Sequence, residues 1–196
     1  MMYPVMLNIE GKECTVIGGG KVALRKAKKL KNCGGAVTVI APEFVEGFDD
    51  IKTIRKCYTA DDIKNSFLVI AATNDRELNL QISKDAKSLN VLVSLADDSS
   101  ASDFVSPATA AVGDITLSVS TNSKFPLLAK KLCAVKSADL ALYNSILPIL
   151  EKYRQQIISE NGDTKKVLLE YMISDEMLET ACRDINLFER KIKEKL

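Results

Sequence analysis

The stretch TVIGGGKVALRKAKKL (residues 15–30) places three glycines between a short apolar run and a basic segment. Gly18, Gly20 and Ala23 match the pattern G-x-G-x-x-G/A, in which glycines make a tight turn after a strand and let the backbone approach a pyrophosphate. From residue 22 onward, apolar side chains recur at helical spacing. We therefore predict a strand over 13–17, a glycine turn, and a helix whose N-terminus faces the phosphates of a dinucleotide. The alternative is a glycine turn that binds nothing.

Strands and helices alternate through the rest of the first half of the chain. Apolar runs predict strands over 36–42, 51–58, 65–73 and 91–96, and the spacing of apolar residues predicts a helix over 76–89. Strands that alternate with helices form parallel βαβ units. We expect an α/β fold of the Rossmann type, with an open, doubly wound parallel sheet.

The pattern changes after residue 106. Residues 107–112 and 115–121 flank Gly113-Asp114, a two-residue turn typical of a β-hairpin. From Pro126 onward we expect helices, with a break at Gly162-Asp163 and a last amphipathic helix over 184–196. The sequence therefore predicts three parts, residues 1–106, 107–140 and 141–196.

The composition excludes several classes of protein. The chain has 196 residues, and its 27 Lys and Arg are balanced by 26 Asp and Glu, so the charge gives no general attraction to nucleic acid or anionic lipid. No apolar run approaches the roughly 20 residues that span a bilayer. The first residues, MMYPVMLNIEGKE, have no basic segment or cleavage site typical of a secretion signal. We expect a cytoplasmic protein that binds neither nucleic acid nor membranes.

Histidine is absent, and the five cysteines are scattered. The spacing of the cysteines excludes a CxxC zinc or redox motif and argues against a disulfide framework. Cys14 and Cys33 are expected to be small buried apolar residues. Without imidazole, acid–base chemistry must come from Asp, Glu, Lys, Tyr or Cys. We predict no metal site.

Two further segments should meet the dinucleotide. An acidic residue at the end of the second strand usually binds the ribose 2′-hydroxyl, and Glu43 is the acid available there. That segment has no Arg to hold a 2′-phosphate, which favours NAD over NADP. The segment AATND (residues 71–75) ends a strand at the same edge, so Thr73 and Asn74 are predicted to contact the cofactor. The alternative for this segment is an ordinary turn before an Asn-capped helix.

With these motifs in place, the chain resembles the precorrin-2 dehydrogenases, which form the amino-terminal module of siroheme synthases and also occur alone. The resemblance runs in family order from Tyr3 to about Leu132, through GGGxVAxRK, VTVIAPEF, AATxDxxxN and the hairpin DFVSPA…GDITLSVST. It implies oxidation of precorrin-2 to sirohydrochlorin with NAD, which many members follow by inserting ferrous iron to give siroheme. It also implies a Rossmann domain, a small dimerisation module within a homodimer, and a helical carboxy-terminal region.

The resemblance carries over to named positions. It implies that the nucleotide contacts Lys21, Val22, Pro42 and Glu43, beside the glycines of the turn, Gly18, Gly19 and Gly20. The family's functional aspartate lies seven residues before the hairpin-entry phenylalanine, Phe104, and this count gives Asp97. A carboxylate there could remove a proton while a hydride leaves the substrate. Asp98 is the alternative base.

One departure lies in the loop after the hairpin. Ser120 and Thr121 match the family, but Asn122-Ser123 replace two glycines and Phe125 replaces a serine before Pro126. Ser120, Thr121 and Asn122 are the expected substrate contacts, and the departure leaves iron insertion open. Two alternatives remain: a dehydrogenase without chelatase activity, and an NAD(H)-sensing binding module, which would not need Asp97.

Overall fold

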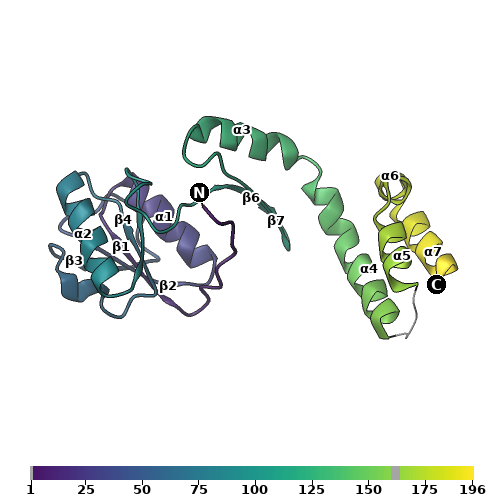
Figure 1. The fold of residues 1–196 in the computed structure, drawn as a ribbon, viewed down its shortest axis with the longest axis horizontal. Helices are drawn as coiled ribbons and strands as arrows, with labels where there is room; N and C mark the ends of the chain where they lie inside the picture. The colour runs from purple at the N-terminus through teal and green to yellow at the C-terminus, as the bar shows by residue number, and fades with distance from the viewer. Residues whose placement is uncertain (1, 160–163) are drawn as a thin grey trace. The chain divides into compact units, whose positions relative to one another are not determined.

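The computed structural model describes residues 2–159 and 164–196. The chain separates into two compact units, Met1–Ser106 and Pro107–Leu196 (Figure 1). The three-part division, with a further boundary after residue 140, stays a prediction. Gly162-Asp163, where the sequence predicts a break between helices, lies outside the described residues.

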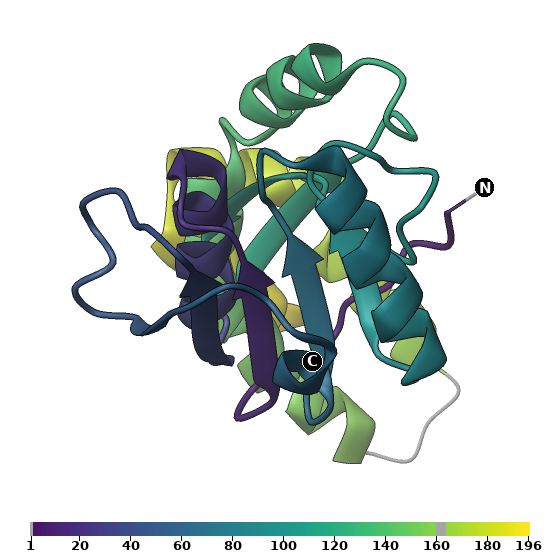
Figure 2. The same ribbon diagram turned by 90° about the vertical axis from the view of Figure 1, so that its left-hand side faces the viewer.

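The first unit is built on a parallel five-stranded sheet in the order β3-β2-β1-β4-β5. Its strands are β1 (Glu13–Ile17), β2 (Ala36–Ala41), β3 (Lys52–Arg55), β4 (Leu68–Ala71) and β5 (Leu92–Leu95). Every neighbouring pair is parallel, and the strand arrows of this unit point the same way in Figure 2. The predicted doubly wound parallel sheet is confirmed.

Helices cover both faces of this sheet. Cys14 and Val16 of β1 pack in one buried cluster with Ala23 and Ala27 of α1 (Lys21–Asn32). Ile17 belongs to a second cluster, which contains Ile82 and Ala86 of α2 (Arg76–Ser88) and Ile63 of the short helix η1 (Ala60–Ile63). Figure 1 shows α1 and α2 on opposite sides of the strands. Alternate residues of each strand point to opposite faces, so each helix has its own apolar surface to cover.

The second unit begins with an antiparallel hairpin, β6 (Ala108–Val112) and β7 (Ile115–Val119). Val112 pairs with Ile115 across the predicted turn, where Gly113 has φ +55°. The helix α3 (Pro126–Lys136) starts at the expected proline and buries Ala129 and Cys133. These observations confirm the predicted hairpin and the helix that follows it.

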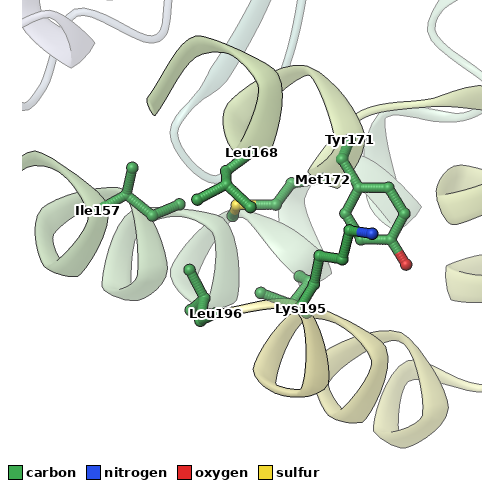
Figure 3. A pocket seen from close by; sticks show the side chains of 7 residues that line it. Ile157, Leu168, Tyr171, Met172, Lys195 and Leu196 are labelled. Carbon is green, nitrogen blue, oxygen red and sulfur yellow. The ribbon is translucent and has the colours of Figure 1, made fainter. Parts of the chain in front are cut away.

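The remaining helices form a core of their own. They are α4 (Leu140–Ser159), α5 (Lys165–Met172), α6 (Asp175–Arg183) and α7 (Ile185–Lys195). Their buried cluster includes Ile146, Tyr153, Met177, Phe188 and Ile192. Figure 3 shows a pocket among them, lined by Ile157, Leu168, Tyr171, Met172, Ile192, Lys195 and Leu196. The pocket is mainly apolar and is a seam between packed helices.

The cysteines and the helix lengths bear on the expectations from composition. Cys14 is buried as expected, but Cys33 is exposed, which corrects the prediction. Cys33 follows the last residue of α1 and caps this helix, so its side chain lies beyond the buried helix face.

Within the described residues, no helix combines the length and apolarity needed to cross a bilayer.

Candidate functional site

The carboxyl ends of the parallel strands meet at one edge of the first unit's sheet. The strand order reverses between β1 and β4, and ligands of open α/β sheets bind at the carboxyl ends beside such a reversal. The glycine turn follows β1, Thr73 and Asn74 follow β4, and Asp97 follows β5. The fold therefore brings these predicted residues to the same edge.

The first two glycines allow three loops to touch. Gly18 is buried with φ +127°, and a Cβ there would overlap the carbonyl oxygen of Ala72. A Cβ on Gly19 would overlap the carbonyl oxygen of Glu43. The backbone also joins these loops, because Val45 N donates to the carbonyl oxygen of Gly19 at 2.9 Å. These glycines are required by packing between loops.

The third glycine, Gly20, lies in open space at the start of α1. Nothing lies within 4 Å of the position that a Cβ on Gly20 would take. Gly20 caps α1 without a side-chain hydrogen bond, and no acidic residue lies in the first turn. Lys21 and Val22 are exposed beside it. A helix N-terminus with free amides and open space binds phosphate, so these residues fit the pyrophosphate of a dinucleotide.

The loop after β2 supplies the groups expected to face the ribose. Pro42 and Glu43 are both exposed. The segment itself has no arginine, as the sequence shows, but β3 brings Arg55 opposite Ala41. Arg55 Nη1 donates to the carbonyl oxygen of Pro42 at 3.5 Å, and its guanidinium lies 5.8 Å from the centroid of the Phe44 ring. A cation therefore lies beside the loop that carries Glu43.

The loop after β4 carries the start of α2. The N-cap is Asp75, whose Oδ1 accepts from the amides of Glu77 (2.9 Å) and Leu78 (3.1 Å). The helix is thus capped by Asp75, not by Asn74 as the alternative interpretation had it. Asn74 is exposed and Thr73 is half-buried. Both predicted residues lie in the loop between β4 and α2.

A fully buried amide links this loop to Asp97. Asn79 lies on α2 with none of its surface exposed. Its Oδ1 accepts from Thr73 N (3.2 Å) and Thr73 Oγ1 (2.8 Å). Its Nδ2 donates to the Thr73 carbonyl oxygen (3.2 Å) and to Asp97 Oδ1 (3.2 Å). The predicted base is therefore hydrogen-bonded to the predicted cofactor loop through one side chain.

The neighbouring carboxylate, Asp98, is engaged in holding its own loop. Its Oδ1 accepts from Ser100 Oγ (2.6 Å), Ser100 N (2.9 Å) and Ala101 N (3.3 Å), and its Oδ2 lies 3.7 Å from Arg76 Nη2. The hydrogen bonds from Ser100 and Ala101 hold the pKa of Asp98 below its usual range. Asp97 is the more exposed of the two. The two aspartates therefore have different environments: Asp98 is bound within its own loop, whereas Asp97 is more open to solvent.

The expected substrate contacts lie in the second unit. Ser120 and Asn122 are exposed and Thr121 is half-buried. Ser120 Oγ accepts from Asn122 N at 3.1 Å, and Thr121 Oγ1 accepts from Phe125 N at 3.2 Å. Asn122 and Ser123 have φ values of +50° and +62°, so the backbone takes the left-handed form that the family's two glycines would favour.

The described part of the chain, residues 2–159 and 164–196, contains no group of three or more Cys, Asp or Glu placed to hold a metal ion.

Comparison with known proteins bears on this edge of the sheet. A family model described as "Putative NAD(P)-binding" matches residues 5–108, more than half of the chain. The chain belongs to this NAD(P)-binding family. The match covers the glycine turn, the Thr73 loop and Asp97 together.

Relatives of this NAD(P)-binding chain are found among the siroheme synthases. The siroheme synthase of Nitrosococcus oceani is 34% identical over 165 residues, covering 80% of this chain and 35% of its own length. That of Psychrobacter arcticus is 36% identical over 138 residues, covering 67% and 25%. A solved structure, SirC, precorrin-2 dehydrogenase, matches with a TM-score of 0.76 and 27% identity over 99% of this chain and 98% of its own. The resemblance to the precorrin-2 dehydrogenases is confirmed, and the chain spans about a third or less of the siroheme synthases.

Two residues that the fold brings to the candidate site, Asn79 and Arg55, are missing from the sequence-based prediction. Asn79 ends the motif AATxDxxxN, and its signal is a polar residue one turn after an N-cap, at a helix position that faces the sheet. Arg55 ends the third strand, and nothing local marks it. The positions of both residues in the site depend on which segments of the chain become neighbours in the fold.

Proposed function

We propose that the chain is an NAD-dependent dehydrogenase that oxidises precorrin-2 to sirohydrochlorin in siroheme synthesis. The observation that carries the proposal is a continuous line of contacts along the carboxyl edge of the sheet. Glu43 contacts Gly19, Gly18 contacts Ala72, and Asn79 joins the Thr73 loop to Asp97. A dinucleotide turn and a carboxylate thus share one edge. The siroheme synthases and the precorrin-2 dehydrogenase among the relatives support the choice of substrate.

The cofactor part of the proposal assigns each loop a task. NAD, when bound, supplies an acceptor for hydride. The amides after Gly20 bind its pyrophosphate, beside Lys21 and Val22, and Glu43 accepts a hydrogen bond from the ribose 2′-hydroxyl. Pro42, Thr73 and Asn74 complete the walls of the site. All of them lie on the three loops that Gly18 and Gly19 hold together.

Asp97 is the proposed base. The oxidation removes two hydrogens from precorrin-2: bound NAD⁺ would take one as a hydride with the electron pair of the broken C–H bond, and the Asp97 carboxylate would take the other as a proton. Of the two Asp97 carboxylate oxygens, only Oδ1 accepts a hydrogen bond from the described residues, so Oδ2 can receive the proton. Asp98 already accepts three hydrogen bonds and faces Arg76. We therefore assign the base role to Asp97.

The proposal extends to the partners of the chain. Large apolar side chains of α3 are exposed, including Leu127 (70%) and Val135 (55%), whereas the small Ala129 and Cys133 are buried, and Cys133 Sγ lies 3.8 Å from the Leu117 carbonyl oxygen of β7. A helix that turns small residues inward and large ones outward needs another apolar surface. We propose a homodimer through this module, with Ser120, Thr121 and Asn122 contacting the tetrapyrrole. The cytoplasmic location expected from the sequence belongs to the same proposal.

The test is an anaerobic assay with precorrin-2 and NAD, read by NADH absorbance and the sirohydrochlorin spectrum. We expect stoichiometric NADH and sirohydrochlorin. Asp97→Asn should lower kcat at least about 100-fold, the range for a general base, while leaving the Kd of NADH within about threefold. Asp98→Asn should retain most of kcat. The reverse order of the two variants would assign the base to Asp98.

Two further arms separate the remaining hypotheses. Ferrous iron is added after sirohydrochlorin has formed, and siroheme formation faster than in an enzyme-free control would show chelatase activity. Iron uptake no faster than the control would make the protein a dehydrogenase alone. A chain that binds NADH but yields none from precorrin-2 would instead fit an NAD(H)-sensing module.

A further inference from the structure

We propose that Asn79 is a positioning residue for the reaction: its buried amide fixes the Asp97 carboxylate against the cofactor loop. The inference rests on the proposed function, since it assigns Asn79 a role only through Asp97. It is independent of the glycine turn, because it follows from the contacts of a single side chain of α2.

The hydrogen bonds settle which way the Asn79 amide points. Its oxygen accepts from the backbone N–H and the hydroxyl of Thr73, so the nitrogen must be the group that meets Asp97. A side-chain amide has two donor hydrogens and two acceptor positions. Here one hydrogen goes to the Thr73 carbonyl oxygen and the other to Asp97 Oδ1. Rotating the amide would place its oxygen against the Thr73 carbonyl oxygen and the Asp97 carboxylate and its nitrogen against Thr73 N–H, so the hydrogen bonds with these three groups would be lost.

Asn79 is itself held firmly, which a positioning group requires. Asp75 caps α2 one turn earlier, and Asn79 N donates to the Asp75 carbonyl oxygen at 3.0 Å. Ile82 and Ala86 anchor the same helix in the buried core. Asp97, in contrast, is exposed in the loop after β5. A fixed donor therefore sets the orientation of a carboxylate that the loop alone would leave free to rotate.

The arrangement selects the oxygen that reacts. With Oδ1 bound to Asn79, Oδ2 is the oxygen that takes the proton. The same amide also binds Thr73 in the predicted cofactor loop. One side chain therefore fixes the position of the base relative to this loop. A misplacement of reacting groups by about 1 Å can lower the rate about 100-fold. Loss of Asn79 is therefore expected to lower kcat more than substrate binding.

Ser83 provides a matched control on the same helix. It lies one turn after Asn79, is also buried (3% exposed), and its Oγ donates to the Ala101 carbonyl oxygen at 2.9 Å. Ser83 thus tethers the loop that carries Asp97 without contacting Asp97. A general loosening of the loop should appear in both Asn79→Ala and Ser83→Ala. A positioning role should appear in Asn79→Ala alone.

The experiment is a double-mutant cycle in the full chain, measured as kcat and KM with saturating NAD. Asn79→Ala should lower kcat about 10- to 100-fold, with the KM for precorrin-2 changed less than threefold and Ser83→Ala near wild type. In an Asp97→Ala background, Asn79→Ala should have less than about a threefold effect, since residues that act together are not additive.

Two results would overturn the inference in different ways. A full effect of Asn79→Ala in the Asp97→Ala background, or an equal loss in Ser83→Ala, would mean that Asn79 does not act through Asp97, while the proposed function stands. A wild-type chain that forms no NADH from precorrin-2 would remove the proposed function and this inference together.

Discussion

The carbonyl oxygen of Glu43 occupies the place where a Cβ on Gly19 would be. Two loops that follow neighbouring strands are therefore in backbone contact at the glycine turn, and Val45 N adds a hydrogen bond to the Gly19 carbonyl oxygen. One residue on, a Cβ on Gly20 would meet nothing within 4 Å. Adjacent glycines of one motif thus serve two purposes, packing at Gly19 and ligand approach at Gly20.

This difference predicts opposite outcomes for two alanine variants. Gly19→Ala should lower the free energy of unfolding by about 1–3 kcal/mol, because the added methyl group forces the loops apart. Gly20→Ala should change it by less than about 0.5 kcal/mol, yet weaken NADH binding at least about tenfold because the methyl group enters the phosphate position. Urea denaturation and fluorescence titration with NADH measure the two effects. A stable Gly19→Ala protein would contradict the packing argument.

A second prediction concerns the choice between NAD and NADP. Glu43 should bind the ribose 2′-hydroxyl and repel a 2′-phosphate, whereas Arg55 stands beside the same loop. Glu43→Gln should therefore shift the ratio of the NADH and NADPH dissociation constants toward NADPH by at least about tenfold, or about 1.4 kcal/mol. Adding Arg55→Gln should reverse the gain. Lys52→Gln, at the start of the same strand, is the control. If Lys52→Gln reversed the gain equally, the preference for NADPH would come from the overall positive charge and not from Arg55.

The sheet could be predicted because its signals are local. β1, β2, β4, β5 and α2 all fall within the predicted ranges, since apolar runs and turn residues mark them directly. The third strand is shorter than the predicted 51–58 because β3 is an edge strand that pairs only with β2, and the last pair is Ala41 with Arg55. Where strand length depends on a neighbour, the sequence pattern alone cannot give it.

The site could be predicted only in part, for the same reason. The glycine pattern marks the turn by itself, but the resemblance to a family was needed to choose Asp97. The contact between Asn79 and Asp97 joins α2 to the loop after β5, 18 positions away in the chain. Arg55 reaches Pro42 only because β3 lies beside β2. No periodicity in the sequence encodes contacts of this kind.

The left-handed backbone at Asn122-Ser123 gives a third prediction. Ser123 has φ +62°, which costs a residue with a Cβ about 1–2 kcal/mol. Ser123→Gly should therefore raise the free energy of unfolding by about 0.5–1 kcal/mol. Ser118→Gly, the same change within β7, should lower it by about 0.5–1 kcal/mol. Urea denaturation of both variants compares them, and destabilisation by Ser123→Gly would show that the serine side chain stabilises the loop.

The last prediction concerns Cys14, which is fully buried beneath α1. Burial, helped by the negative charge of Glu13, raises the pKa of the Cys14 thiol to about 11. The folded state therefore keeps this proton at pH values where the unfolded chain loses it, so stability is complete below the ordinary thiol pKa and falls as pH rises toward 11. One such group gives a slope of at most about 1.4 kcal/mol per pH unit.

Urea denaturation between pH 8 and about 11 should show a shallower decline for Cys14→Ala than for the wild type, whereas Cys33→Ala, at an exposed thiol, should follow the wild type. Parallel curves for wild type and Cys14→Ala would mean that the Cys14 thiol ionises equally in both states.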